Sequence, residues 1–230
     1  MRAVPVAILL ASLALLAGGC GSSGQKSNGV EDKTAHEIVQ SAATAAKSAS
    51  SVHISGSIDA GGPVTIDLTL AKNQGGKGEI KTNGMSFQII STGGKVYFKT
   101  DAAALQKLTG AGIAGQLLAG RWIVAPSSLG QVSSFDALTN LTKLFNSLTT
   151  SLGVLQKGDT TKINGQPAIA VTSTRKGGGG TLYVATTGQP YPLQLQGSKG
   201  NAGTITFDKW DEPVTISPPA NPVDFSKLKG

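Results

Sequence analysis

The chain has 230 residues, enough for one domain with a sizeable core, and a formal net charge of +7. Its basic residues are scattered and its aromatic content is only 5%, which argues against nucleic acid as a partner, because nucleic-acid-binding proteins gather basic side chains into a patch or stripe. Cys20 is the only cysteine, so no disulfide can form within the chain.

The first residues have the layout of an export signal. Arg2 precedes an apolar run from Ala3 to Ala17, and Gly18-Gly19-Cys20 follows. The run is short for a membrane span, which needs about 20 apolar residues. We therefore expect residues 1–19 to be a signal peptide and Cys20 to be lipid-modified. An ordinary secretory signal with an unmodified cysteine is the alternative, and a transmembrane anchor is less favoured still.

Lipidation of Cys20 would hold the chain on the extracytoplasmic face of the cell membrane. Two or more acyl chains are needed, because one chain binds a bilayer only marginally. Residues 21–30 are rich in Ser and Gly, so we expect a flexible tether after the cysteine and divide the chain into residues 20–33 and a single domain over 34–230. Basic residues outnumber acidic ones, 20 to 13 in the precursor, which suits a position near anionic lipid head groups.

The expected domain begins with a helix and continues with strands. Thr34-x-x-Glu37 is a capping-box pattern, and apolar residues at helical spacing follow it, which predicts a helix over about 34–50. From Val52 the apolar period changes to two, with Gly-rich turns between the segments. This pattern predicts a five-stranded antiparallel meander over 52–59, 64–70, 77–83, 85–91 and 95–100.

Helical patterns return in the middle of the chain. Residues 101–118 predict one or two short helices broken by glycine, and residues 121–124 a short strand. Ser133-x-x-Asp136 then opens a clearer helix, whose apolar residues alternate spacings of three and four. Those residues are Phe135, Leu138, Leu141, Phe145, Leu148 and Leu152, with Leu144 and Leu155 widening the apolar surface.

The C-terminal part predicts strands again, over 160–164, 167–174, 181–186, 192–196 and 204–210. The Pro-rich stretch from Pro213 to Pro222 is expected at a sheet edge or as a tail. An open antiparallel sheet of about ten strands tends to curl. The expected class is therefore α+β, with one curled antiparallel sheet and helices.

No chemistry of catalysis or metal binding is evident. His36 and His53 stand among Ser and Ala rather than beside other ligands, and no nucleophile elbow is present. Asp67 and Glu79 could come close on outward faces of neighbouring strands, but solvated surface charges are the favoured interpretation. We expect no catalytic residue, no metal and no cofactor, and a protein that is not an enzyme.

The glycines at 177–180 predict a hairpin tip, because a phosphate loop would need G-K-[S/T] opening a helix. Arg175 and Lys176 beside the tip either contact phosphate head groups or are simply solvated, and the second interpretation is favoured.

Several short features occur together: the cysteine after small residues, a helix before the first strand, Gly120-Arg121-Trp122, the turn Asn164-Gly165-Gln166-Pro167, and the stretch from Thr181 to Leu195. This combination resembles the LppX/LprG-type lipoproteins of mycobacteria and related actinobacteria, a family structurally similar to the periplasmic lipoprotein carrier LolA. The resemblance covers about Thr34 to Leu228.

The resemblance implies a half-barrel whose concave face is covered by helices and encloses an apolar cavity. Such a cavity would take the acyl chains of lipids or glycolipids that the protein carries or presents across the envelope, with a membrane transporter as a candidate partner. The candidate lining residues are Ile66, Leu68, Leu70, Phe87, Ile89, Val96, Phe98, Leu141, Phe145 and Leu148.

Periodicity alone fits a closed core equally well. The second hypothesis is therefore a non-enzymatic envelope interaction or sensor module with a solid core, and an enzyme is the third and weakest.

Overall fold

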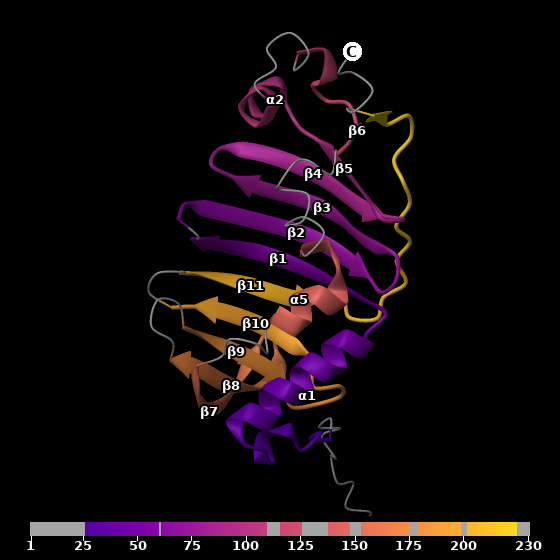
Figure 1. Cartoon of the computed structure of the whole chain (residues 1–230). Helices are drawn as coiled ribbons and strands as arrows, with labels where there is room; N and C mark the ends of the chain where they lie inside the picture. The colour runs from indigo at the N-terminus through magenta and orange to yellow at the C-terminus, as the bar shows by residue number, and fades with distance from the viewer. Residues whose placement is uncertain are drawn as a thin grey trace, which may run out of the picture.

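The computed structural model describes residues 26–59, 61–109, 116–125, 138–147, 153–174, 179–198 and 202–224. Within them, twelve strands form one sheet in the order β12-β6-β5-β4-β3-β2-β1-β11-β10-β9-β8-β7 (Figure 1). The strands of the N-terminal part are β1 (Ser51–Asp59), β2 (Pro63–Ala71), β3 (Gly75–Thr82), β4 (Met85–Thr92), β5 (Lys95–Lys99) and β6 (Ile123–Val124). Those of the C-terminal part are β7 (Val154–Ile163), β8 (Gln166–Thr174), β9 (Gly180–Ala185), β10 (Pro192–Gly197), β11 (Gly203–Asp208) and β12 (Val223–Asp224).

Two antiparallel meanders make up this sheet. Strands β1 to β5 pair with their neighbours in chain order, as predicted, and β7 to β11 do the same. The meanders are joined through β1 and β11, which pair antiparallel from His53↔Asp208 to Ile58↔Gly203. The β12–β6 pair is parallel. The first and last thirds of the chain therefore meet in the middle of the sheet.

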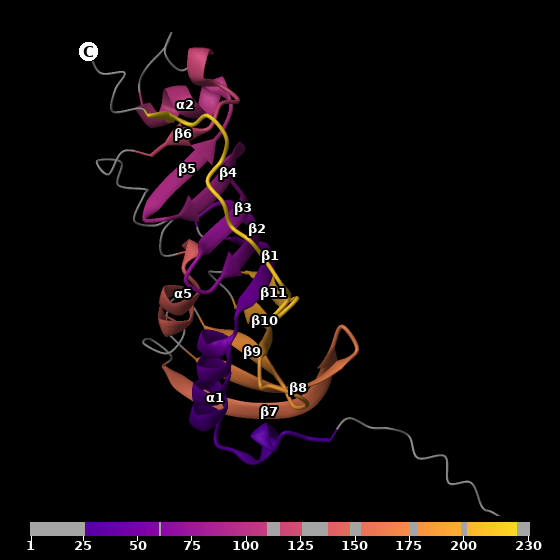
Figure 2. The ribbon, with the colours of Figure 1, turned by 90° about the vertical axis from the view of Figure 1, so that its right-hand side faces the viewer.

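The sheet curls, and helices lie on its concave side (Figure 2). They include α1 (Ala35–Ser48) and α5 (Leu141–Ser147), while α2 (Ala102–Thr109) lies at the end of the sheet near β5 and β6 (Figure 1). The α+β class and the curled sheet are thus confirmed, with twelve strands in place of about ten. Among the described residues, no helix is both long and apolar enough to cross a membrane.

Helix α1 begins where the capping box predicts. The Thr34 backbone N–H donates to Glu37 Oε2 (2.9 Å), and the Glu37 N–H donates to Thr34 Oγ1 (3.4 Å). Bonding by the N-cap lowers the pKa of the Glu37 carboxyl. The buried face of the helix is largely alanine, which lets its backbone approach the sheet closely.

Packing against the domain begins at residues that the sequence assigned to the tether. Asn28 Nδ2 donates to the carbonyls of Ala185 (3.0 Å) and Gly188 (3.1 Å), and Asn28 Oδ1 accepts from the Val30 N–H (3.0 Å). The side chain of Val30 is 1% exposed. Polar residues in this stretch suggested a tether, but Asn28 supplies the carbonyl-binding contacts of a docked segment. The packed part therefore begins near Ser27, and residues 1–25, including Cys20, lie outside the described residues.

The helix predicted from Ser133 differs from the structure. In the described part, a helical turn at residues 138–139 is interrupted at Asn140, whose Oδ1 accepts from the Lys143 N–H (3.0 Å) and so caps α5. Leu155 is not on this helix, because Gly153, at φ 60°, precedes the start of β7. The spacing of apolar residues that predicted the helix includes Leu155 by coincidence, because this residue belongs to β7. Phe135, Leu148 and Leu152 lie outside the described residues.

The Pro-rich stretch forms a strap, residues 212–222, that runs past the ends of the strands to the far edge of the sheet (Figure 1). Gln74 holds it with both amide atoms: Nε2 donates to the Val214 carbonyl (3.3 Å) and Oε1 accepts from the Ile216 N–H (3.1 Å). Beyond the strap, the Val223 N–H donates to the Trp122 carbonyl (2.8 Å) and β12 begins. The expected edge position is confirmed for the residues that follow Pro222.

Candidate functional site

The concave face is apolar because strand residues alternate between the two sides of the sheet. Inward side chains of β1 to β5 and β11 form one buried cluster with residues of the helices. Its members are Ala46, Val52, Ile54, Leu68, Leu70, Ile80, Phe87, Ile89, Val96, Ala104, Leu141, Phe145, Ile205 and Phe207.

Most of the predicted lining residues belong to this cluster. Those that do, each at most 5% exposed, are Leu68, Leu70, Phe87, Ile89, Val96, Leu141 and Phe145. Ile66 is only partly buried and packs against them, whereas Phe98 lies in a separate cluster with Leu105, Leu118 and Ile123. Leu148 lies outside the described residues. The structure thus brings most of these residues together without testing their role as a cavity lining.

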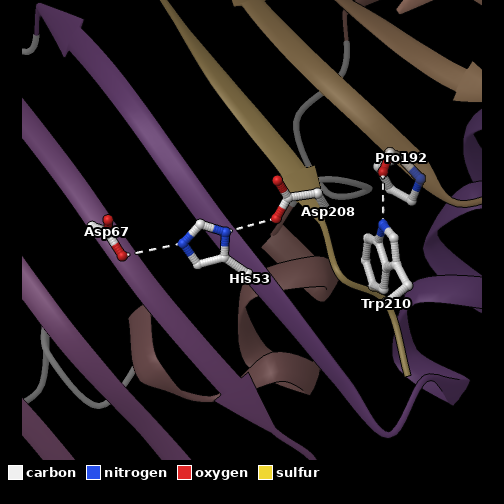
Figure 3. A network of polar contacts seen from close by, with 5 residues as sticks. All are labelled: His53, Asp67, Pro192, Asp208 and Trp210. Carbon is white, nitrogen blue, oxygen red and sulfur yellow. Dashed lines mark hydrogen bonds and ion pairs between the residues drawn. The ribbon is translucent and has the colours of Figure 1, made fainter. Parts of the chain in front are cut away.

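Aromatic packing fills the concave face beneath α5. The ring of Phe145, fully buried, lies 5.6 Å from the rings of Phe207 and Trp210, measured between centroids. Trp210 Nε1 donates to the Pro192 carbonyl (3.2 Å; Figure 3), and its ring stacks on Tyr191 at 4.4 Å. The sequence identified Trp210 only as the end of a strand. Its burial depends on a helix distant in sequence, so this end of the face is a packed core.

Farther along the same face, large apolar side chains are only partly buried. They pack against the core cluster but keep some exposure, and they come from both meanders. We call these five residues the open apolar surface: Ile58, Val64, Ile66, Met85 and Leu195. Because exposed apolar area is costly in water, this region is the best candidate for contact with an apolar ligand.

Three glycines border the open apolar surface. Gly197 of β10 pairs with Gly180 of β9 and with Gly203 of β11, and Gly203 is the register partner of Ile58. At Gly203 the backbone has φ 142°, and a Cβ would lie 2.1 Å from the Ser57 carbonyl oxygen. Only glycine fits there. We call Gly180, Gly197 and Gly203 the glycine corner. Because these positions carry no side chain, the backbone itself forms the surface of the concave face there.

The convex face carries a polar network that the sequence did not predict. His53 on β1 lies between Asp208 on β11 (Nδ1–Oδ1, 2.6 Å) and Asp67 on β2 (Nε2–Oδ1, 3.1 Å; Figure 3). Both ring nitrogens are used in these contacts, so His53 ties three strands together across the junction of the two meanders. Among the described residues, no group of three or more His, Cys, Asp or Glu side chains is placed to hold a metal ion.

Asp67 and Glu79 are indeed neighbours, as the sequence suggested, because they are register partners on β2 and β3. Their contacts differ, however. Glu79 Oε1 accepts from Ser86 Oγ (2.5 Å) and Oε2 lies 3.1 Å from Lys81 Nζ, and these bonds lower the pKa of the Glu79 carboxyl. Each carboxylate thus has its own polar partner, and the two do not form a carboxylate pair.

Asp211 fixes the root of the strap. Tyr191 Oη donates to Asp211 Oδ2 (2.5 Å), and the backbone N–H of Ser50 donates to Oδ1 (2.7 Å). The Tyr191 bond lowers the pKa of the Asp211 carboxyl. Burial, together with the same bond, raises the pKa of Tyr191 to about 12.

No protein-family profile matches the sequence, and no curated protein matches it significantly. Among solved structures, LprF from Mycobacterium bovis matches with a TM-score of 0.59 and 17% identity, over 81% of this chain and 97% of LprF. The lipoprotein LppX of Mycobacterium tuberculosis matches with a TM-score of 0.53 and 18% identity, over 80% of this chain and 98% of LppX. This chain has their fold. The resemblance inferred from short motifs is therefore confirmed for the architecture.

Proposed function

We propose that the protein is an envelope lipoprotein, anchored through Cys20, whose concave face binds acyl chains of lipids or glycolipids and carries or presents them across the envelope. The observation that carries the proposal is the open apolar surface. It continues directly from the buried core and is bordered by the glycine corner, where an acyl chain can lie on backbone. A shared fold with a protein described as a lipoprotein supports it.

The energetics are adequate for such binding. Each CH₂ group removed from water contributes roughly 0.8 kcal/mol, so ten groups of an acyl chain contribute about 8 kcal/mol before the costs of association. The packed aromatic end beneath α5 forms the inner wall in this proposal, because Phe145 and Trp210 already fill it. The ligand then occupies the end of the face that holds Ile58, Ile66 and Met85.

Native mass spectrometry tests the proposal. The chain from Gly21 onward is produced in a lipid-rich bacterial host and purified without detergent, and we expect it to retain lipid in a stoichiometric amount. Ile66→Lys places a charge on the open apolar surface and should abolish retention. Thr65→Lys is the matched control, because the neighbouring residue faces the opposite side of β2. Lipid-free protein from several hosts, with a folded domain, would contradict the proposal.

A second candidate function is an interaction or sensor module with a solid core, favoured by the packing around Phe145 and Trp210. This candidate predicts that a defined protein partner co-purifies with the lipid-free chain. It also predicts that Ile66→Lys leaves that capture unchanged.

The anchor is tested separately by Cys20→Ala in the producing organism. The variant should be released from membranes and should lose incorporation of radioactive palmitate, while its thermal unfolding stays that of the wild type. Continued membrane retention of the folded Cys20→Ala variant would count against the anchor but not against acyl-chain binding.

A further inference from the structure

The convex face, opposite the open apolar surface, carries a shallow groove of about 420 Å³. Outward side chains of β2, β3 and β4 form its floor, and Trp122 lies at one end. The groove combines an aromatic ring and the half-buried Ile90 with two carboxylates, the Lys77 ammonium group and an amide.

Strand register places the key groups in one line. Asp67 pairs with Glu79, Glu79 with Gln88, and Gln88 with Lys99, on four consecutive strands. Trp122 precedes β6 and extends the line, with Lys99 Nζ 5.3 Å from the centroid of its ring. Because neighbouring strands lie about 4.8 Å apart, the line from β2 to β6 is roughly 19 Å long.

The contacts of these side chains leave polar atoms for a ligand. Asp67 uses Oδ1 toward His53, and its side chain is 69% exposed. His53, itself held by Asp208, thereby positions the Asp67 carboxylate at the edge of the groove. Gln88 is exposed and offers both a donor and an acceptor.

A sugar chain presents the complementary chemistry. Its hydroxyl groups donate to carboxylates and to the Gln88 carbonyl, and its C–H faces pack on an indole ring. The spacing between strands is close to the length of one pyranose unit, so successive units can meet successive side chains of the line. Charges of both signs lie in and beside the groove, because Lys77 lines it with Asp67 and Glu79, and Lys81 Nζ lies 3.1 Å from Glu79 Oε2, so a ligand with many hydroxyl groups needs no charge of its own to bind.

We propose that this convex groove binds a glycan chain, with Trp122 as the stacking platform and Asp67, Glu79 and Gln88 as hydrogen-bonding groups. The proposal is independent of acyl-chain binding, because the two surfaces lie on opposite sides of the sheet.

The test uses the full-length protein in a zwitterionic detergent without a sugar head group. It is titrated with tetramers of β-1,4-linked N-acetylglucosamine, α-linked mannose and α-1,4-linked glucose, and the side-chain NMR signals of Trp122 and Gln88 are followed. At least one tetramer should bind saturably and shift both signals. Absence of saturable binding for all three tetramers would overturn the proposal.

Variants separate the groove from general surface effects. Trp122→Ala and Gln88→Ala should each weaken binding at least tenfold, whereas Trp122→Phe should retain most of it. Gln194→Ala is the matched control, because Gln194 lies on the same face in β10, outside the groove. Unchanged affinity in folded Gln88→Ala protein would overturn the assignment. Lipid retention measured on the same variants should stay at the wild-type level.

Discussion

Replacing Phe145 by Ala is the sharpest test of the packed end of the concave face. The side chain is fully buried between α5 and the sheet, and its ring contacts those of Phe207 and Trp210. Helix α5 has only seven residues and cannot be stable by itself, so it depends on Phe145 and Leu141, which bury it against the core cluster.

The expected loss in unfolding free energy is about 3–5 kcal/mol, the usual cost of a buried Phe→Ala change. Roughly 1–3 kcal/mol of that belongs to the two aromatic contacts. For a domain of this size the melting temperature should fall by roughly 6–20 °C. Urea denaturation followed by tryptophan fluorescence measures the loss, and the emission of Trp210 should shift to the red in the folded variant.

Thr142→Ala is the control, because Thr142 is exposed on the same helix and its loss should change stability by less than about 0.5 kcal/mol. A Phe145→Ala loss below about 1 kcal/mol would refute the packed core. It would mean that the region beneath α5 is loosely filled, and the acyl-chain surface would then have to extend there.

Three further predictions concern other parts of the fold. Gly203→Ala should cost at least about 2 kcal/mol in urea denaturation, because a Cβ at φ 142° would collide with a carbonyl of the neighbouring strand. Asn28→Ala should cost about 1–2 kcal/mol and speed exchange of the Val30 amide, because three hydrogen bonds of the docked segment are lost, one of them from the Val30 N–H; Lys26→Ala should leave both unchanged. Asp211→Asn should be less stable than the wild type near neutral pH, and the difference should shrink in acid titrations as the pH falls below about 4, because the folded-state pKa of Asp211 is depressed and its contribution is lost through that pKa.

Each of these has a clear contrary result. Wild-type stability of Gly203→Ala would mean that the strands relax without strain. Unchanged exchange in Asn28→Ala would mean that burial of Val30 and the backbone bond from Asn28 N–H to the Thr186 carbonyl suffice to hold the segment. A stability gap for Asp211→Asn that persists unchanged to low pH would assign the effect to packing rather than to the charge.

The sequence predicted the meander of β1 to β5 because this part of the sheet has one buried and one solvent-exposed face. Apolar and polar residues therefore alternate strictly along its strands. The N-terminal half of β7 was missed for the opposite reason. This edge strand is exposed on both faces over most of its length, so it carries no alternating pattern. Strand β6 lies within the short strand predicted over 121–124, whereas β12 has two residues and depends on β6, a neighbour that the fold brings to it.

Only some features of the two candidate sites could be predicted from the sequence. The inward residues of β2 and β4 followed from periodicity, and the fold class from the order of elements. The His53–Asp208 contact could not be predicted, because it joins residues 155 positions apart and requires the β1–β11 pairing. The line from Asp67 to Trp122 likewise depends on the register of four strand pairs, which single-sequence patterns do not determine.

The pairing of β1 with β11 also has a consequence for biogenesis. The unprotected edge of β1 is made early, but its partner is synthesised last among the strands of the second meander, so at 5–20 residues per second the edge waits roughly 7–30 s. A sheet with such distant pairing folds slowly. During that interval the unpaired backbone groups of the β1 edge can pair with another chain, so this edge is the part of the nascent sheet most exposed to aggregation.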